Sequence, residues 1–197
     1  MKNVRKTIDI AVYAFSCAVV FGCSTPSTTQ QAASGTPPSA VERGKYLVTI
    51  GGCNDCHTTK KMTANGPEPD ASKMLAGHPA EVQLPPAPAI AANGPWGIVT
   101  TATLTAWSGP WGVSFAANLT PDQTGLGDWT EDMFVKAMRT GKHMGASRPI
   151  LPPMPWQDFA AMSDEDLKAV FAYLRSIPPV VNRVPSPIPR SNAGAQQ

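Results

Sequence analysis

The sequence is poor in the residues that build crosslinks, metal clusters or strongly charged surfaces. Its 197 residues include 4 cysteines and 3 histidines, and charged residues make up 15%. The formal net charge is +2, without the concentrated basic face that binds nucleic acids. Long apolar runs are also missing, because the run over residues 7–22 is short for a membrane span and is interrupted by Asp9.

Two of the four cysteines lie in the segment Cys53-Asn54-Asp55-Cys56-His57. Cys-x-x-Cys-His is the attachment signature of c-type haem. Each thiol can form a thioether with one haem vinyl group, and the adjacent histidine can bind the iron from one side. We therefore expect one covalent haem c, held by Cys53 and Cys56, with His57 as an iron ligand.

A zinc site and a redox dithiol are the alternative interpretations of this pair of cysteines. Zinc needs four ligands, and a mixed set of Cys53, Cys56, His78 and His143 has no recognisable ligand spacing. A thioredoxin-like dithiol would lie near a βαβ pattern, and none is visible. We expect His78 to lie in a surface loop, because the sequence from it to Pro95 is rich in proline.

The N-terminus has the organisation of an export signal. Three basic residues precede the apolar run, and the segment ends in Cys23. Residues 1–22 are therefore predicted to be a lipoprotein-type signal peptide, with Cys23 lipidated after cleavage. An ordinary cleaved signal or an uncleaved anchor is the alternative. Residues 23–38 are polar and of low complexity, which predicts a flexible tether.

These assignments use every cysteine. Cys17 leaves with the signal, Cys23 takes lipid, and Cys53 and Cys56 take haem, so no thiol remains for a disulfide framework. Loss of the signal also removes three basic residues and Asp9, which brings the formal charge of the mature chain to about zero. The predicted location is the periplasmic side of a bacterial membrane, lipid-anchored through Cys23, or soluble in the periplasm as the alternative.

Residues 39–181 are predicted to form one haem domain with three main helices. Ser39 and Glu42 form a capping box at the start of the first helix, which leads into the haem motif. Thr130 and Ser163 precede two further segments with acidic first turns and helical spacing of apolar residues. Residues 182–197 form a proline-rich tail.

Residues 58–129 form a long insert that is harder to interpret. The motif Gly-Pro-Trp-Gly occurs at residues 94–97 and again at 109–112, which predicts two similar turns. Residues 98–107 and 113–118 are rich in β-branched and aromatic side chains, so we expect a small β-hairpin there.

The loop between the last two helices contains the candidates for the second axial ligand of the iron. Met154 lies within a stretch that contains four prolines, and a ligand on a stiff loop is already held in place. A methionine ligand also raises the reduction potential. Met154 is the leading candidate, Met144 the second and His143 the third; the remaining alternative is a five-coordinate iron with Met154 only filling the pocket. Trp156 is expected to line the pocket, and Arg148 or Trp156 to contact a haem propionate.

Several further segments resemble class I c-type cytochromes, and in particular the haem domains of membrane-associated bacterial cytochrome c subunits that serve dehydrogenases. The resemblance covers about residues 41–181. It implies a mainly α, class I cytochrome c fold with three to five helices around one haem, His57 and Met154 as ligands, and Gly44 packed near Tyr173. Such subunits often carry several haem motifs, whereas this chain has one, and its insert is longer than a minimal cytochrome needs. The segments that carry the resemblance, besides the haem motif, are Asn118–Asp122, Thr124–Trp129, Arg139–Gly141, Met154–Pro155, Ser163–Leu167 and Ala172–Leu174.

The function expected from these features is single-electron transfer, without catalysis and without a small-molecule substrate. The partners would be a redox protein donor and acceptor, such as a dehydrogenase subunit, with electrons passing between a periplasmic or membrane dehydrogenase and the respiratory chain. A haem enzyme such as a peroxidase needs an open iron position and usually a second haem, and a gas-binding sensor also needs an open position. The single haem motif near the start of the domain favours the electron carrier over both.

Overall fold

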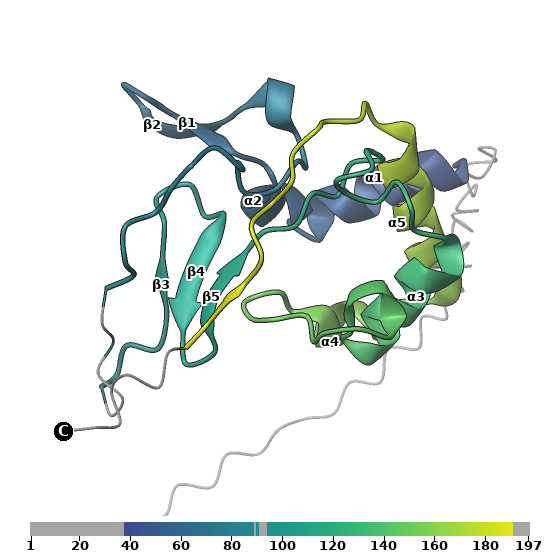
Figure 1. Ribbon diagram of the computed structural model, residues 1–197. Helices are drawn as coiled ribbons and strands as arrows, with labels where there is room; N and C mark the ends of the chain where they lie inside the picture. Colours follow the sequence, from purple (N-terminus) through teal and green to yellow (C-terminus); the bar gives the residue numbers. More distant parts are fainter. Residues whose placement is uncertain (1–37, 89, 91–93, 191–197) are drawn as a thin grey trace, which may run out of the picture. The chain divides into compact units, whose positions relative to one another are not determined.

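The computed structural model describes residues 38–88, 90 and 94–190 (Figure 1). The predicted signal segment, Cys23 and the predicted tether up to residue 37 lie outside the described residues. The helices are α1 (Ala40–Ile50), α2 (Cys53–His57), α3 (Glu131–Thr140), α4 (Trp156–Phe159) and α5 (Asp164–Ser176), with 3₁₀ turns η1 (Ala71–Lys73) and η2 (His143–Gly145). The strands are β1 (Lys60–Thr63), β2 (Gly66–Pro69), β3 (Val99–Thr100), β4 (Ala106–Gly109), β5 (Gly112–Phe115) and β6 (Ile188–Pro189).

The three predicted main helices are confirmed, and each begins at the expected cap. Ser39 Oγ accepts a hydrogen bond from the Glu42 backbone N–H at 3.2 Å, and Glu42 Oε2 accepts one from Ser39 N–H at 2.8 Å. The side chains of Thr130 and Ser163 cap α3 and α5 in the same way. None of the helices in the described part of the chain is long and apolar enough to cross a membrane.

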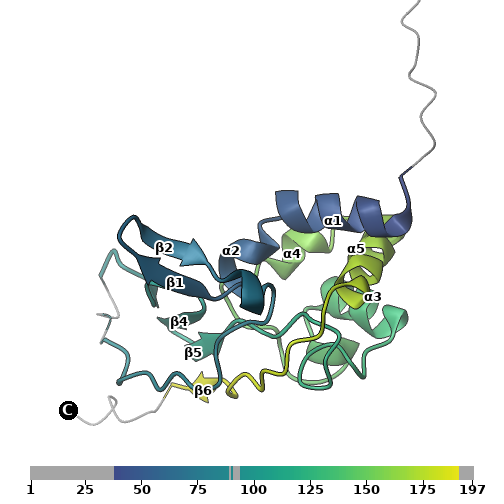
Figure 2. The same cartoon turned by 90° about the horizontal axis from the view of Figure 1, so that it is seen from above.

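Helices α1 and α5 cross in close contact, with α3 packed beside them (Figure 2). The crossing depends on Gly44, since a Cβ atom there would lie 1.9 Å from Ala169 O and 2.8 Å from Tyr173 Cβ. The expected proximity of Gly44 and Tyr173 is therefore confirmed. Around the crossing lies the hydrophobic core, which includes Leu47, Val48, Leu75, Leu126, Phe134, Met138, Leu167, Val170, Phe171 and Leu174.

The prediction of a mainly α, class I cytochrome c fold is wrong, because the chain also builds two antiparallel sheets. Strands β1 and β2 form a hairpin, and the second sheet has the strand order β3-β4-β5-β6. Most of these strands come from the insert, where prolines and β-branched residues oppose helix formation. The hairpin β4–β5 lies in the region where a hairpin was expected.

The two Gly-Pro-Trp-Gly motifs differ in structure. The second motif makes the two-residue turn between β4 and β5, with Gly109 paired to Gly112. Gly112 has a φ of +105° and lies so close to β6 that a Cβ atom would be 2.1 Å from Ile188 O. The first motif lies in an exposed bend, and its Trp96 is 79% exposed. Only the second motif therefore shapes the sheet.

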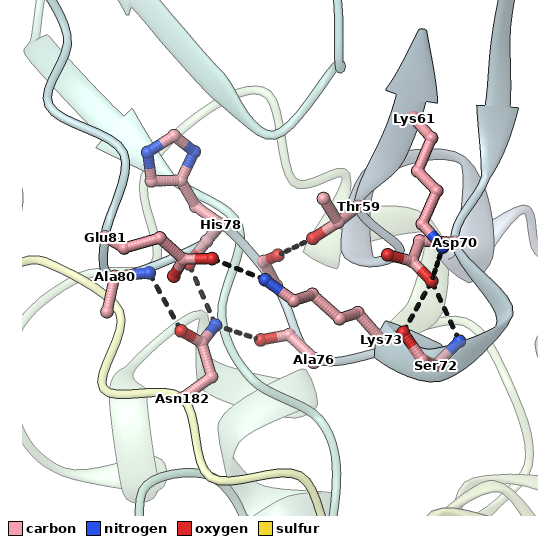
Figure 3. A network of polar contacts seen from close by, with 11 residues as sticks. Thr59, Lys61, Asp70, Ser72, Lys73, Ala76, His78, Ala80, Glu81 and Asn182 are labelled. Carbon is pink, nitrogen blue, oxygen red and sulfur yellow. Dashed lines mark hydrogen bonds and ion pairs between the residues drawn. The ribbon is translucent and has the colours of Figure 1, made fainter. Parts of the chain in front are cut away.

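The C-terminal segment returns along the insert and ties its loops together (Figure 3). Asn182 Nδ2 donates hydrogen bonds to Ala76 O at 2.6 Å and to His78 O at 2.9 Å, while Ala80 N–H donates to Asn182 Oδ1 at 2.9 Å. Further along, β6 pairs with β5, with Val113 opposite Ile188. The part of the predicted proline-rich tail that the structure describes is thus an extended strap.

Candidate functional site

A largely apolar cavity of about 380 Å³ lies between the helices and the β4–β5 hairpin. Helices α1, α3 and α5 contribute core side chains to its wall, including Leu47, Phe134, Met138, Leu167, Val170 and Leu174. The haem motif contributes Cys53, Cys56 and His57, and the proline-rich loop before α4 contributes Met154. Four residues singled out by the sequence therefore line the same cavity.

Helix α2 brings the three functional side chains of the motif together. Cys53 and Cys56 are three residues apart and His57 is four residues from Cys53, so the three lie on one face of a single helical turn. Gly52, at the N-cap, has a φ of +65° and allows the chain to turn sharply from α1 into α2. The helix that the capping box starts thus delivers the motif to the cavity.

The orientation of His57 is fixed by a backbone carbonyl. Its Nδ1 lies 2.8 Å from Ala117 O, and because a carbonyl only accepts, Nδ1 carries the proton. The other ring nitrogen, Nε2, then keeps its lone pair for a metal. Burial lowers the pKa of His57, with the Ala117 hydrogen bond opposing this effect, so the imidazole is neutral at physiological pH.

The two thiols are held in their protonated form. Burial raises the pKa of Cys53 to about 11 and also raises the pKa of Cys56. Redox-active cysteines have lowered pKa values. The raised pKa values of Cys53 and Cys56 therefore disfavour the redox dithiol.

The histidines of the alternative zinc site are directed elsewhere. His78 is 1% exposed, which corrects the expectation of a surface loop residue; its Nδ1 lies 2.9 Å from Thr105 Oγ1. The ring of His143 packs edge-on against Trp129, with the ring centroids 5.1 Å apart. Within the described residues, no group of three or more His, Cys, Asp or Glu side chains is arranged to hold a metal ion.

Met154 is one of three methionines that line the cavity, together with Met138 and Met162. Met138 is 8% exposed within the core on α3, whereas Met154 is partly buried on the proline-rich loop. The two other candidates for the second axial position, Met144 and His143, are not among the residues that line the cavity.

Trp156 and Arg148 are also not among the lining residues. Trp156 packs against the end of α3, where a Cβ atom at Gly141 would lie 2.3 Å from its Cε2. Arg148 is exposed, and its Nη1 donates a hydrogen bond to Pro149 O at 3.3 Å. Phe159, by contrast, does line the cavity.

Two of the lining residues that the sequence does not single out come from the β4–β5 hairpin. Trp107 on β4 and Ser114 on β5 are cross-strand partners, and both face the cavity. Trp107 is 8% exposed and Ser114 is 6% exposed. Buried positions alternate along β5, so the strand pattern can predict that Ser114 faces inward. That the inward face of β5 borders this cavity is seen only in the fold.

The donor set and the lining fit a c-type haem. Two thiols and an imidazole with a free Nε2 lie on one helical turn, and a thioether lies on the wall of the same cavity. The remaining wall is mainly apolar, as an environment for a porphyrin requires.

Comparison with known proteins also points to cytochromes. The chain is 32% identical over 142 residues to a gluconate 2-dehydrogenase cytochrome c subunit of Pantoea cypripedii, which covers 71% of this chain and 24% of that protein. It is 27% identical over 161 residues to a fructose dehydrogenase cytochrome subunit of Gluconobacter japonicus, covering 79% of this chain and 25% of the relative. The chain is a relative of bacterial dehydrogenase cytochrome c subunits. The resemblance seen in the sequence is thereby confirmed.

A third relative is the cytochrome c subunit of a quinone alcohol dehydrogenase from Gluconobacter oxydans, with 27% identity over 150 residues. The match covers 74% of this chain and 23% of the relative. The chain thus spans about a quarter of the length of these cytochrome relatives. No protein-family model matches it. All three relatives are named as cytochrome subunits of dehydrogenases.

Proposed function

We propose that this protein is a single-electron carrier with one haem, attached covalently through Cys53 and Cys56 and ligated by His57 and Met154. The observation that carries this proposal is the convergence of these four side chains on one apolar cavity. A haem held by these residues would supply one-electron redox chemistry.

The chain's own residues would retain and orient the cofactor. Cys53 and Cys56 would hold the haem through thioethers, formed by addition of each S–H group across one vinyl double bond, and these bonds would prevent loss of the haem. The Ala117 carbonyl keeps His57 turned with Nε2 free. The mainly apolar wall would offer few polar groups that rearrange when the charge on the site changes.

Met154 would set the level of the reduction potential. A His/Met pair gives a higher potential than ligation by two nitrogen ligands. With both axial positions filled by side chains, the site would have no open coordination position for a peroxide or a gas. This arrangement suits an electron carrier and not a haem enzyme or sensor.

The proposed partners are a redox donor and acceptor, one of them a dehydrogenase, as the relatives are subunits of dehydrogenases. The proposed location is the periplasmic side of a bacterial membrane, with a lipid anchor at Cys23. The near-zero charge predicted for the mature chain favours weak, brief and partly apolar docking over strong electrostatic steering.

Replacement of the distal ligand tests the proposal. Met154→Ala should abolish the methionine-to-iron charge-transfer band, permit carbon monoxide binding and lower the potential by more than about 59 mV, the tenfold step of a one-electron couple. Met138→Leu and Met162→Leu are matched controls that conserve volume in the same cavity and should retain the band. An unchanged spectrum and potential in Met154→Ala would refute Met154 as the ligand and direct the search to the control methionines, Met144 and His143.

A further inference from the structure

The loop that carries Met154 has few backbone tethers of its own. Prolines at positions 152, 153 and 155 have no N–H group to donate. At the start of the loop, Ile150 N–H donates a hydrogen bond to Gly141 O at 2.7 Å. At the end of the loop, Trp156 N–H donates a hydrogen bond to Met154 O at 2.9 Å. Between those ends, the stiffness of the prolines does not by itself fix where the loop lies relative to the cavity.

One side chain from the opposite wall supplies the missing tether. Ser114 Oγ, on β5, donates a hydrogen bond of 2.6 Å to Pro152 O across 38 residues of sequence. Among the described residues, this is the one hydrogen bond made by residues 151–153. Because Pro152 is two positions before Met154, the bond fixes the loop close to the thioether.

A tryptophan at the hairpin turn completes the arrangement. Trp111 Nε1 donates to Ser114 Oγ at 3.2 Å, so the hydroxyl accepts one hydrogen bond while its own hydrogen is directed to Pro152 O. The Trp111 ring folds back over Gly109, where a Cβ atom would lie 2.5 Å from the ring. The second Gly-Pro-Trp-Gly turn therefore positions the Trp111 N–H group, and this group in turn orients the Ser114 hydroxyl.

We infer that Ser114, oriented by Trp111, is a positioning residue for Met154, and that holding the methionine loop is a function of the β4–β5 hairpin. The hydrogen bonds from Trp111 Nε1–H to Ser114 Oγ and from Ser114 Oγ–H to Pro152 O hold the loop against the cavity wall, which would help a weak thioether ligand to compete with exogenous ligands. The inference rests on the proposed ligation by Met154. It gives the hairpin part of the insert a role at the site.

The test is the strength of the sixth ligand in the purified haem protein, measured by competition with imidazole. Ser114→Ala should raise the apparent imidazole association constant about tenfold, the effect of about one net hydrogen bond, and weaken the methionine-to-iron charge-transfer band. Ser114→Thr, which keeps a hydroxyl, should restore both values. Trp111→Phe, which keeps an aromatic ring but removes the N–H, should shift imidazole affinity in the same direction by a smaller factor.

The chain offers a matched control for each variant. Ser108→Ala changes a serine on the neighbouring strand whose hydroxyl has no hydrogen bond to the described residues, and Trp96→Phe changes the exposed tryptophan of the other Gly-Pro-Trp-Gly motif. Both should leave imidazole binding unchanged.

Wild-type imidazole affinity in Ser114→Ala would overturn the positioning role; if that variant does not fold, wild-type affinity in Trp111→Phe would overturn it. A wild-type protein without the charge-transfer band would instead refute ligation by methionine itself, so the two failures are distinguishable.

Discussion

The contact between α1 and α5 predicts a large penalty for adding a single methyl group at Gly44. In Gly44→Ala, the new Cβ would lie 1.9 Å from Ala169 O and 2.6 Å from Ala169 C, against the 3.4 Å at which ordinary contact begins. Both opposing atoms belong to the backbone, so no side-chain rotation can relieve the clash. The two helices must therefore move apart by more than about 1 Å, which loosens contacts that bury Leu47 and Leu174.

The expected magnitude follows from two opposing effects. Overpacking a close-packed interface costs about 1–3 kcal/mol, and the value should lie near the top of that range because only backbone displacement relieves the contact. Alanine is favoured over glycine in a helix by about 0.5–1 kcal/mol. The net loss of unfolding free energy is then about 2 kcal/mol, which corresponds to roughly 6 °C in the melting temperature of a domain of this size.

Guanidinium and thermal unfolding of the purified protein, followed by circular dichroism, would measure the loss. Gly97→Ala is the matched control, since a Cβ atom at Gly97 has no neighbour within 4 Å. If Gly44→Ala unfolds within about 0.5 kcal/mol of the wild type, the close crossing of α1 and α5 is refuted.

Two further predictions concern the acid stability of the insert and the membrane anchor. The hydrogen bonds of Ser72 and the ammonium of Lys61 lower the pKa of Asp70 to about 2 from the usual 3.8, so its contribution to stability is full above about pH 4 and is lost as the pH falls towards 2. In guanidinium titrations, Asp70→Asn should therefore have a lower unfolding free energy than the wild type at pH 6. Its unfolding free energy should also fall less than that of the wild type on acidification. An equal pH dependence of the unfolding free energy in the two proteins would contradict this. Cys23→Ser should move the protein from the membrane to the soluble fraction in cell fractionation, and persistent association without detergent would indicate an uncleaved anchor or a tight complex.

Sequence reasoning succeeded where the signals were local. Caps at Ser39, Thr130 and Ser163 mark the starts of the three main helices, because a capping side chain acts within three residues of its own position. The haem motif is equally local, since the helical repeat alone places Cys53, Cys56 and His57 on one face.

The sheets and the far wall of the cavity depend on partners distant in sequence. Strand β5 pairs with β6, so that Val113 lies opposite Ile188, and nothing in the local sequence of either strand predicts its partner. For the same reason the sequence did not reveal that Asn182 ties down the insert or that Ser114 reaches Pro152. The mainly α fold implied by the resemblance, with one small hairpin in the insert, did not include the other strands, which form only when their partners are in place.

The central claim is that one haem is ligated by His57 and Met154, and it is tested most directly by absorption spectra of the oxidised and reduced protein with and without carbon monoxide. The account predicts low-spin spectra in both states, a methionine-to-iron charge-transfer band in the oxidised state and no change on addition of carbon monoxide. A high-spin spectrum, or ready binding of carbon monoxide, would contradict it and favour a haem enzyme or sensor with an open iron position.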